Sequence, residues 1–184
     1  GRGRCALMWL VAGERSSGKT AALFRLASSV AQASVEDRPV LLVCERGKAE
    51  GDPPESLIEA FREANAAHGD AGGAKQDLAL ADLMEGLQKV RMVYAEGPRD
   101  LFRLCSWLHV MPDEQLPECV VIDDLDSLLA AEAVTERSLA KSLAYLANMA
   151  AHLSSRHEGA DEATSCGVVC SITTAAGESL ALDA

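Results

Sequence analysis

Eight residues near the start of the chain constrain its fold more than any other feature. Residues 13–20, GERSSGKT, match the pattern G-x-x-x-x-G-K-[ST] of a phosphate-binding P-loop. The pattern follows an apolar run over residues 5–12 and opens an Ala- and Leu-rich stretch over residues 19–33. A buried strand, this loop and a helix in that order form the context in which the pattern is specific. The sequence therefore predicts an α/β fold that begins with a strand, a P-loop and a helix.

The chemistry of the loop predicts a role for each part of it. Glycines at both ends permit backbone dihedrals that other residues resist, so that successive N–H groups point inward and form an anion nest. The following helix adds the partial positive charge of its N-terminus. Lys19 is expected to reach the β- and γ-phosphates, and the Thr20 hydroxyl to bind Mg²⁺. We expect ATP or a similar nucleotide, with Mg²⁺, to contact Gly13, Glu14, Arg15, Ser16, Ser17, Gly18, Lys19 and Thr20. The alternative to nucleotide binding is that residues 13–20 form only a glycine turn between a strand and a helix.

The rest of the chain predicts further strands that alternate with helices. Apolar residues make up 48% of the chain and aromatic residues 4%, which suits a parallel sheet covered by helices. Trp9 lies within the first apolar run and is expected in the core. We expect one domain over residues 1–184, with a flexible insertion over residues 46–76. Predicted strands cover 5–12, 39–45, 90–95, 119–122 and 166–173, and predicted helices cover 19–33, 55–66, 80–87, 99–111 and 135–155.

Two acidic positions follow predicted strands. Asp123 ends the apolar run Val120-Val121-Ile122, and an acid at the carboxyl edge of a parallel sheet faces a phosphate site and can hold Mg²⁺ through water. A helix cap or a solvated acid is the other interpretation. Hydrolysis also needs a group that orients water, and Glu45, at the end of the second strand, is the first candidate. Asp124 is the second candidate. The third possibility is that neither Glu45 nor Asp124 orients the water.

Charge and cysteine content limit the class of protein. The net charge of −11 repels nucleic acid on average, and it fits either solubility or a basic partner surface. Six cysteines form no C-x-x-C pair and no zinc spacing, which indicates reduced thiols in a cytosolic or nuclear protein. The first apolar run is too short to span a bilayer, so no membrane association is expected.

The motifs in chain order resemble the core of RecA-type recombinases. That order is GERSSGKT, VLLVCERG, VRMVYA, CVVIDDLD and CGVVCSITT. Within that family, residues 87–109 and the stretch SCGVVCSITT are similar to the SWIM-associated ATPases of animal Shu complexes, which are divergent recombinase paralogues. The resemblance runs from residue 5 to about residue 177, and residues 46–86 match least.

The resemblance implies a RecA-like P-loop ATPase core in a nuclear protein of homologous recombination and DNA repair. It implies slow ATP hydrolysis, a heterodimer with a SWIM-domain zinc protein, and support of RecA-type recombinase filaments on single-stranded DNA. By motif match, Lys19 and Thr20 would contact phosphate and Mg²⁺, and Asp123 would be the Walker B acid. Glu45 carries over from the wider recombinase pattern as the catalytic acid.

Two departures from the recombinase pattern favour a different function. The family usually places a polar sensor just after its fifth strand, and here Ala175 follows Thr174. The resemblance also stops before the final strands of the recombinase core, so we expect a fold truncated at its C-terminus. These departures favour a non-catalytic scaffold for a SWIM-domain partner as the alternative. A small-molecule P-loop kinase is disfavoured, because residues 46–86 carry no basic cluster.

Shorter features keep more than one interpretation. The recombinase docking pattern F-x-x-A occurs at Phe24, where core packing is favoured, and at Phe61, which lies beside a loop. Arg99 and Arg103 are one helical turn apart and either form a solvated face or contact DNA or an acidic partner. Trp107, on the same predicted helix, belongs to the core or to a partner surface.

Overall fold

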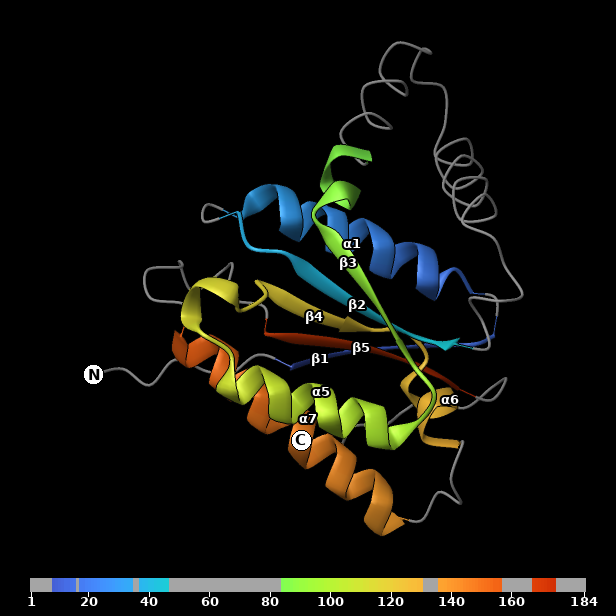
Figure 1. Cartoon of the computed structure of the whole chain (residues 1–184). Coiled ribbons are helices and arrows are strands. Elements are labelled where there is room, and N and C mark those ends of the chain that lie inside the picture. Colours follow the sequence, from blue (N-terminus) through green and yellow to red (C-terminus); the bar gives the residue numbers. More distant parts are fainter. Residues whose placement is uncertain are drawn as a thin grey trace, which may run out of the picture.

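A computed structural model describes residues 8–15, 17–34, 37–46, 84–130, 136–156 and 167–174. These residues form a five-stranded, all-parallel sheet flanked by helices, so the predicted α/β class is confirmed (Figure 1). The elements in chain order are β1 (Met8–Gly13), α1 (Lys19–Ala33), β2 (Val40–Glu45), β3 (Val90–Ala95), α5 (Pro98–Val110), the 3₁₀ turn η1 (Asp113–Gln115), β4 (Cys119–Ile122), α6 (Leu125–Ala130), α7 (Glu136–Arg156) and β5 (Val168–Thr173).

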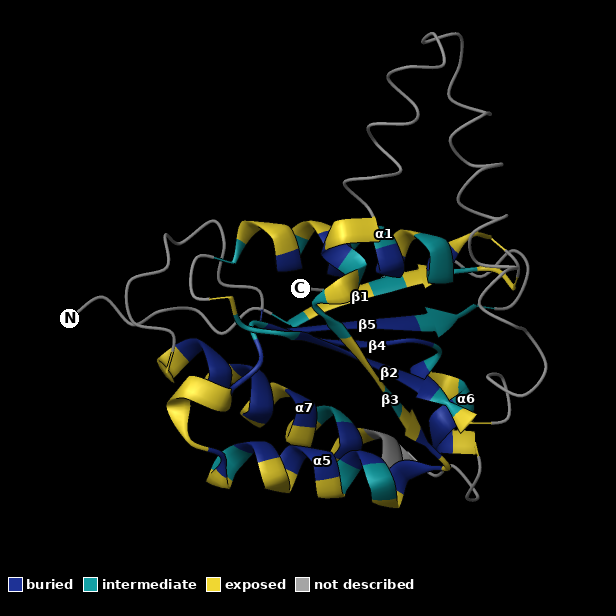
Figure 2. Ribbon diagram, turned by 45° about the horizontal axis from the view of Figure 1, so that its top comes forward, coloured by how far each residue is buried: buried dark blue, intermediate teal, exposed yellow. Residues whose placement is uncertain are grey.

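The strand order across the sheet is β1-β5-β4-β2-β3. The chain therefore crosses the sheet in one direction between β1 and β2, and it returns in the other direction between β3 and β5. Right-handed crossovers that run in opposite directions place their helices on opposite faces of a sheet. Figure 2 shows this arrangement, with α1 on one face and α5 and α7 on the other.

Each face of the sheet has its own hydrophobic core, because successive side chains of a strand point to opposite faces. In β2, Leu41 and Val43 join the core under α5 and α7, whereas Val40, Leu42 and Cys44 join the core under α1. All five are buried. The central strands β2, β4 and β5 are thus covered on both faces, as their continuous apolar sequences predict.

The first strand departs from expectation, because it is not buried. Trp9 is 56% exposed and Leu10 is 37% exposed, so the prediction that Trp9 belongs to the core is wrong. The reason is the position of β1, which pairs only with β5 among the described strands and forms an edge of the sheet. An apolar run cannot reveal by itself whether a strand is central or at an edge.

The main helices agree with the sequence prediction. Helices were expected at 19–33, 99–111 and 135–155, and α1, α5 and α7 begin and end within one residue of these bounds. Phe24 of α1 is buried in the core, as expected. The short helix α6 was not predicted. Residues 47–83, which include Phe61 and most of the predicted insertion, lie outside the described residues. No helix in the described part of the chain is long and apolar enough to cross a membrane.

Candidate nucleotide-binding site

The loop between β1 and α1 lies at the carboxyl end of the sheet. Gly18, which immediately precedes α1, has a φ of +82°, a left-handed conformation that favours glycine. The N–H of Thr174, just after β5, donates to the Gly13 carbonyl over 3.0 Å and holds the start of the loop against the neighbouring strand. Ser16 lies outside the described residues, and the other loop positions are described.

Lys19 turns back over the loop that precedes it. Its ammonium donates to the carbonyl oxygens of Gly13 at 2.8 Å and Glu14 at 2.6 Å. The residue is only 9% exposed, and within the described part of the chain no carboxylate forms an ion pair with it. A buried ammonium without a counter-ion is costly. The loop therefore holds a positive charge that no described carboxylate pairs, at the place where the predicted phosphates would lie.

Thr20 and Asp123 meet although 103 positions separate them in the sequence. The Thr20 hydroxyl lies 3.0 and 3.2 Å from the two carboxylate oxygens of Asp123. Asp123 is 4% exposed, and its N–H donates to the Val43 carbonyl over 2.9 Å, which fixes the end of β4 against β2. A hydroxyl and a carboxylate are the hard oxygen ligands that Mg²⁺ takes in nucleotide sites.

A second layer of hydrogen bonds holds this end of β4 to β5. The buried Ser171 hydroxyl donates to Asp123 Oδ1 over 3.0 Å, and the Ser171 oxygen accepts the Asp124 N–H over 2.8 Å. The Thr173 hydroxyl donates to Asp124 Oδ1 over 3.1 Å, and the Thr173 N–H donates to Asp126 Oδ1 over 3.0 Å. Asp124 itself has a left-handed φ of +53°. These bonds fix the turn after β4 that carries Asp123 and Asp124.

Sequence reasoning missed Ser171, although a signal was present. A serine in the middle of a strand buried on both faces must find a hydrogen-bond partner, because an unpaired buried hydroxyl is costly. The apolar run Val168-Val169-Cys170 directly precedes Ser171. Which partner it meets follows only from the strand order, since β5 lies between β1 and β4.

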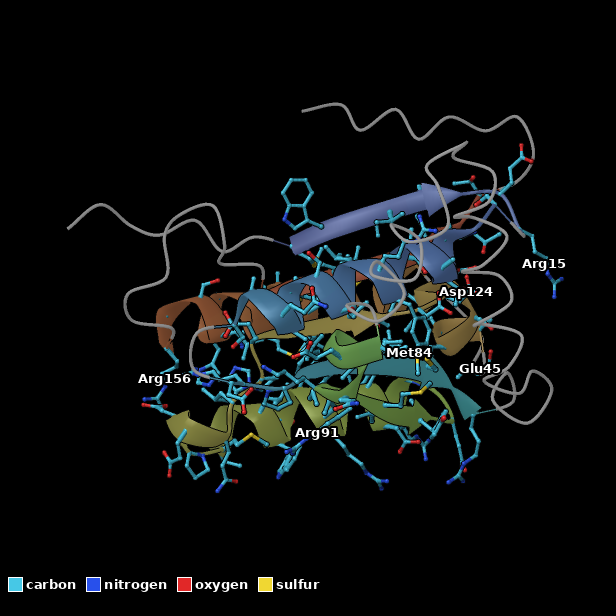
Figure 3. All side chains as sticks on the ribbon, turned by 90° about the horizontal axis from the view of Figure 1, so that it is seen from above. Arg15, Glu45, Met84, Arg91, Asp124 and Arg156 are labelled. Carbon is cyan, nitrogen blue, oxygen red and sulfur yellow. The ribbon has the colours of Figure 1, made fainter. Side chains whose placement is uncertain are left out.

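The two candidate catalytic acids lie at the same end of the sheet. Figure 3 shows Glu45, Asp124 and Arg15 at one end and Arg156 at the other. The Ser127 hydroxyl, on α6, donates to Glu45 Oε2 over 2.5 Å and ties this carboxylate to the helix that follows β4. Arg15 is exposed, and its side chain extends away from the ribbon.

The described residues disfavour two other kinds of site, a metal centre made only of protein ligands and a nucleophilic cysteine. Within these ranges no group of three or more His, Cys, Asp or Glu side chains is arranged to hold a metal ion. Mg²⁺ at Thr20 and Asp123 would therefore need phosphate or water oxygens as its remaining ligands. Cys44, Cys105, Cys119 and Cys170 are buried and form no disulfide with one another. Burial raises the pKa of the Cys170 thiol to about 12, so it is no nucleophile at neutral pH.

Comparison with known proteins assigns no family to the chain. No model of a known protein family matches it, and a search of curated proteins finds no match. The inference that the chain binds a nucleotide therefore rests on the geometry of the site.

Proposed function

We propose that this chain binds ATP together with Mg²⁺ at the β1–α1 loop, as the nucleotide-binding subunit of a RecA-like complex. The observation that carries the proposal is the buried Lys19 ammonium, which is held by two loop carbonyls and lacks a described carboxylate partner. A polyphosphate would supply the missing negative charge. The adjacent Thr20–Asp123 pair would hold the metal ion that accompanies it.

In the proposed complex, different groups of the chain would bind the phosphates and the metal ion. The backbone N–H groups of the loop and the start of α1 would hold the phosphate oxygens. Lys19 would leave the loop carbonyls to contact the β- and γ-phosphates. Mg²⁺, when bound, neutralises part of the phosphate charge. Ser171 keeps the Asp123 carboxylate turned toward Thr20.

Hydrolysis would require Glu45 to orient the attacking water. The hydrogen bond from Ser127 holds this carboxylate at the carboxyl edge of the sheet, one strand away from Asp123. Glu45→Gln retains an oxygen that can accept the Ser127 hydroxyl but loses the charge. We expect Glu45→Gln to keep nucleotide binding and to lower single-turnover hydrolysis at least about tenfold. Unchanged hydrolysis would exclude Glu45 as the catalytic acid.

The decisive test of binding uses Lys19→Met, which keeps the length and apolar stem of the side chain. Loss of a charge-assisted contact costs about 1.5–3 kcal/mol, so ATP affinity should fall about 10- to 150-fold. Stability without nucleotide should be unchanged or higher, because the substitution removes a buried charge that no described carboxylate pairs. Radiolabelled ATP in equilibrium dialysis and urea unfolding measure the two effects.

Lys141→Met is the matched control for this experiment. It removes the same charge from the exposed surface of α7, on the other face of the sheet, and should leave ATP affinity unchanged. Equal ATP retention by the wild-type and Lys19→Met proteins would refute the proposed site.

The biological setting of the proposal rests on the resemblance to recombinase paralogues. It comprises a nuclear homologous-recombination mediator, a SWIM-domain zinc partner and a RecA-type recombinase on single-stranded DNA. A non-catalytic scaffold remains the second candidate. Co-purification with the SWIM partner that survives Lys19→Met would favour the scaffold, and loss of the complex would favour ATP-dependent assembly.

A further inference from the structure

The outer face of α5 combines basic and apolar side chains that the core does not use. Arg99, Arg103, Ser106, Trp107 and Val110 recur along one side of this helix and are all exposed. Trp107 is 55% exposed and Val110 is 78% exposed, so Trp107 is excluded from the core. The opposite side of α5 packs into the core through Leu101, Leu104, Cys105 and Leu108.

A shallow hollow of about 400 Å³ lies on this face, lined by Arg99, Phe102, Arg103 and Ser106. We call these four residues, with Trp107 and Val110, the α5 patch. The Phe102 ring packs against Tyr145 of α7, with ring centroids 4.8 Å apart. The Lys141 ammonium, also on α7, lies 5.3 Å from the Phe102 centroid.

Three cationic side chains therefore surround an aromatic floor in a protein whose net charge is −11. Arg103 lies 3.3 Å from Asp100, but its side chain is 83% exposed, so that ion pair is weak and can exchange partners. Arginine and aromatic side chains are enriched where proteins bind one another. The local charge is complementary to carboxylates.

Nucleic acid fits this surface less well than an acidic peptide does. Sites for single strands combine a long basic groove with open aromatic faces. The α5 patch extends about 16 Å from Arg99 to Val110, and Tyr145 and Lys141 already occupy the surroundings of the Phe102 ring. The net charge of the whole chain is −11, which repels phosphates on average.

We propose that the α5 patch binds an acidic segment of a partner protein that carries an apolar residue beside its carboxylates. Arg99 and Arg103 are four helical residues apart, about 6 Å along the axis. Two carboxylates at positions i and i+2 of an extended segment have a matching spacing of about 7 Å. An apolar side chain further along the segment would then meet Trp107 and Val110. This inference does not depend on ATP binding.

Selection from a random-peptide library on the full chain tests the proposal. Recovered peptides should carry two acidic residues followed by an apolar one. Their affinity, measured by fluorescence anisotropy, should fall at least about tenfold with Arg103→Glu and should weaken as salt is added. Trp107→Ala, which removes an exposed side chain, should weaken binding without loss of fold.

Arg25→Glu is the matched control, since α1 lies on the opposite face of the sheet (Figure 2), and peptide affinity should be unchanged. Three results would overturn the proposal. The first is recovery of no peptide or only of peptides without acidic residues. The second is equal binding to wild type and Arg103→Glu. The third is binding of a labelled oligothymidylate that Arg103→Glu lowers, which would identify a nucleic-acid surface instead.

Discussion

The substitution Ser171→Ala should destabilise the protein far more than the loss of one oxygen atom implies. Ser171 is completely buried, donates to Asp123 and accepts the N–H of Asp124. Loss of a hydrogen bond to a carboxylate costs about 1.5–3 kcal/mol, and removal of the acceptor of the half-buried Asp124 N–H costs about 1–3 kcal/mol. Asp123 keeps the hydroxyl of Thr20, so we expect the lower part of that sum, about 3 kcal/mol.

Urea unfolding followed by far-ultraviolet circular dichroism measures this loss. A decrease of about 3 kcal/mol is a large part of the 5–15 kcal/mol that stabilises a typical domain. The midpoint of thermal unfolding should fall by about 6–12 °C. Ser106→Ala is the control, because Ser106 is exposed and its hydroxyl, among the described residues, donates only to the Phe102 carbonyl of its own helix. It should change the free energy of unfolding by less than about 0.5 kcal/mol.

Ser171→Ala also tests the proposed metal site through ATP affinity, which is measured independently of stability. Asp123 loses one of the bonds that orient it, so the gain in ATP affinity on adding Mg²⁺ should shrink, while metal-free ATP binding should change little. A loss of stability below about 1 kcal/mol would contradict the reasoning, because both hydrogen bonds would then contribute almost nothing.

Three further measurements test other parts of the fold. Gly86→Ala should cost about 1–3 kcal/mol of unfolding free energy, since its Cβ would lie 2.7 Å from the Ser28 backbone oxygen; Ser28→Ala should not rescue it. Burial, together with the nearby His109 and Arg156, lowers the pKa of His152, so the folded protein binds this proton less readily than the unfolded chain. Stability should therefore fall as pH drops below about 6.5, and His152→Gln should reduce that fall in urea titrations at pH 7.5 and 5.5. Iodoacetamide at pH 8 should leave Cys170 unmodified in the native protein and alkylate it only after unfolding, as peptide mass spectrometry would show.

The comparison of β1 with β2 shows where sequence reasoning stops. Both strands are continuous apolar runs, and both were predicted to be buried. β2 has neighbours on both sides and helices on both faces, whereas β1 pairs only with β5 in the described sheet and exposes Trp9. Hydrophobic periodicity reports the element type, but it carries no information about which strand will lie beside it.

In the candidate site, too, the sequence determined some features and the tertiary structure decided others. Sequence by itself determined the loop, the helix that follows it, the strand that ends in Asp123 and the α/β class, because glycine conformation and apolar runs act over a few residues. Only the tertiary structure brought Thr20 against Asp123, inserted Ser171 behind that carboxylate and joined Glu45 to Ser127. These contacts link positions 48 to 103 residues apart, and the order in which parallel strands pair decides them.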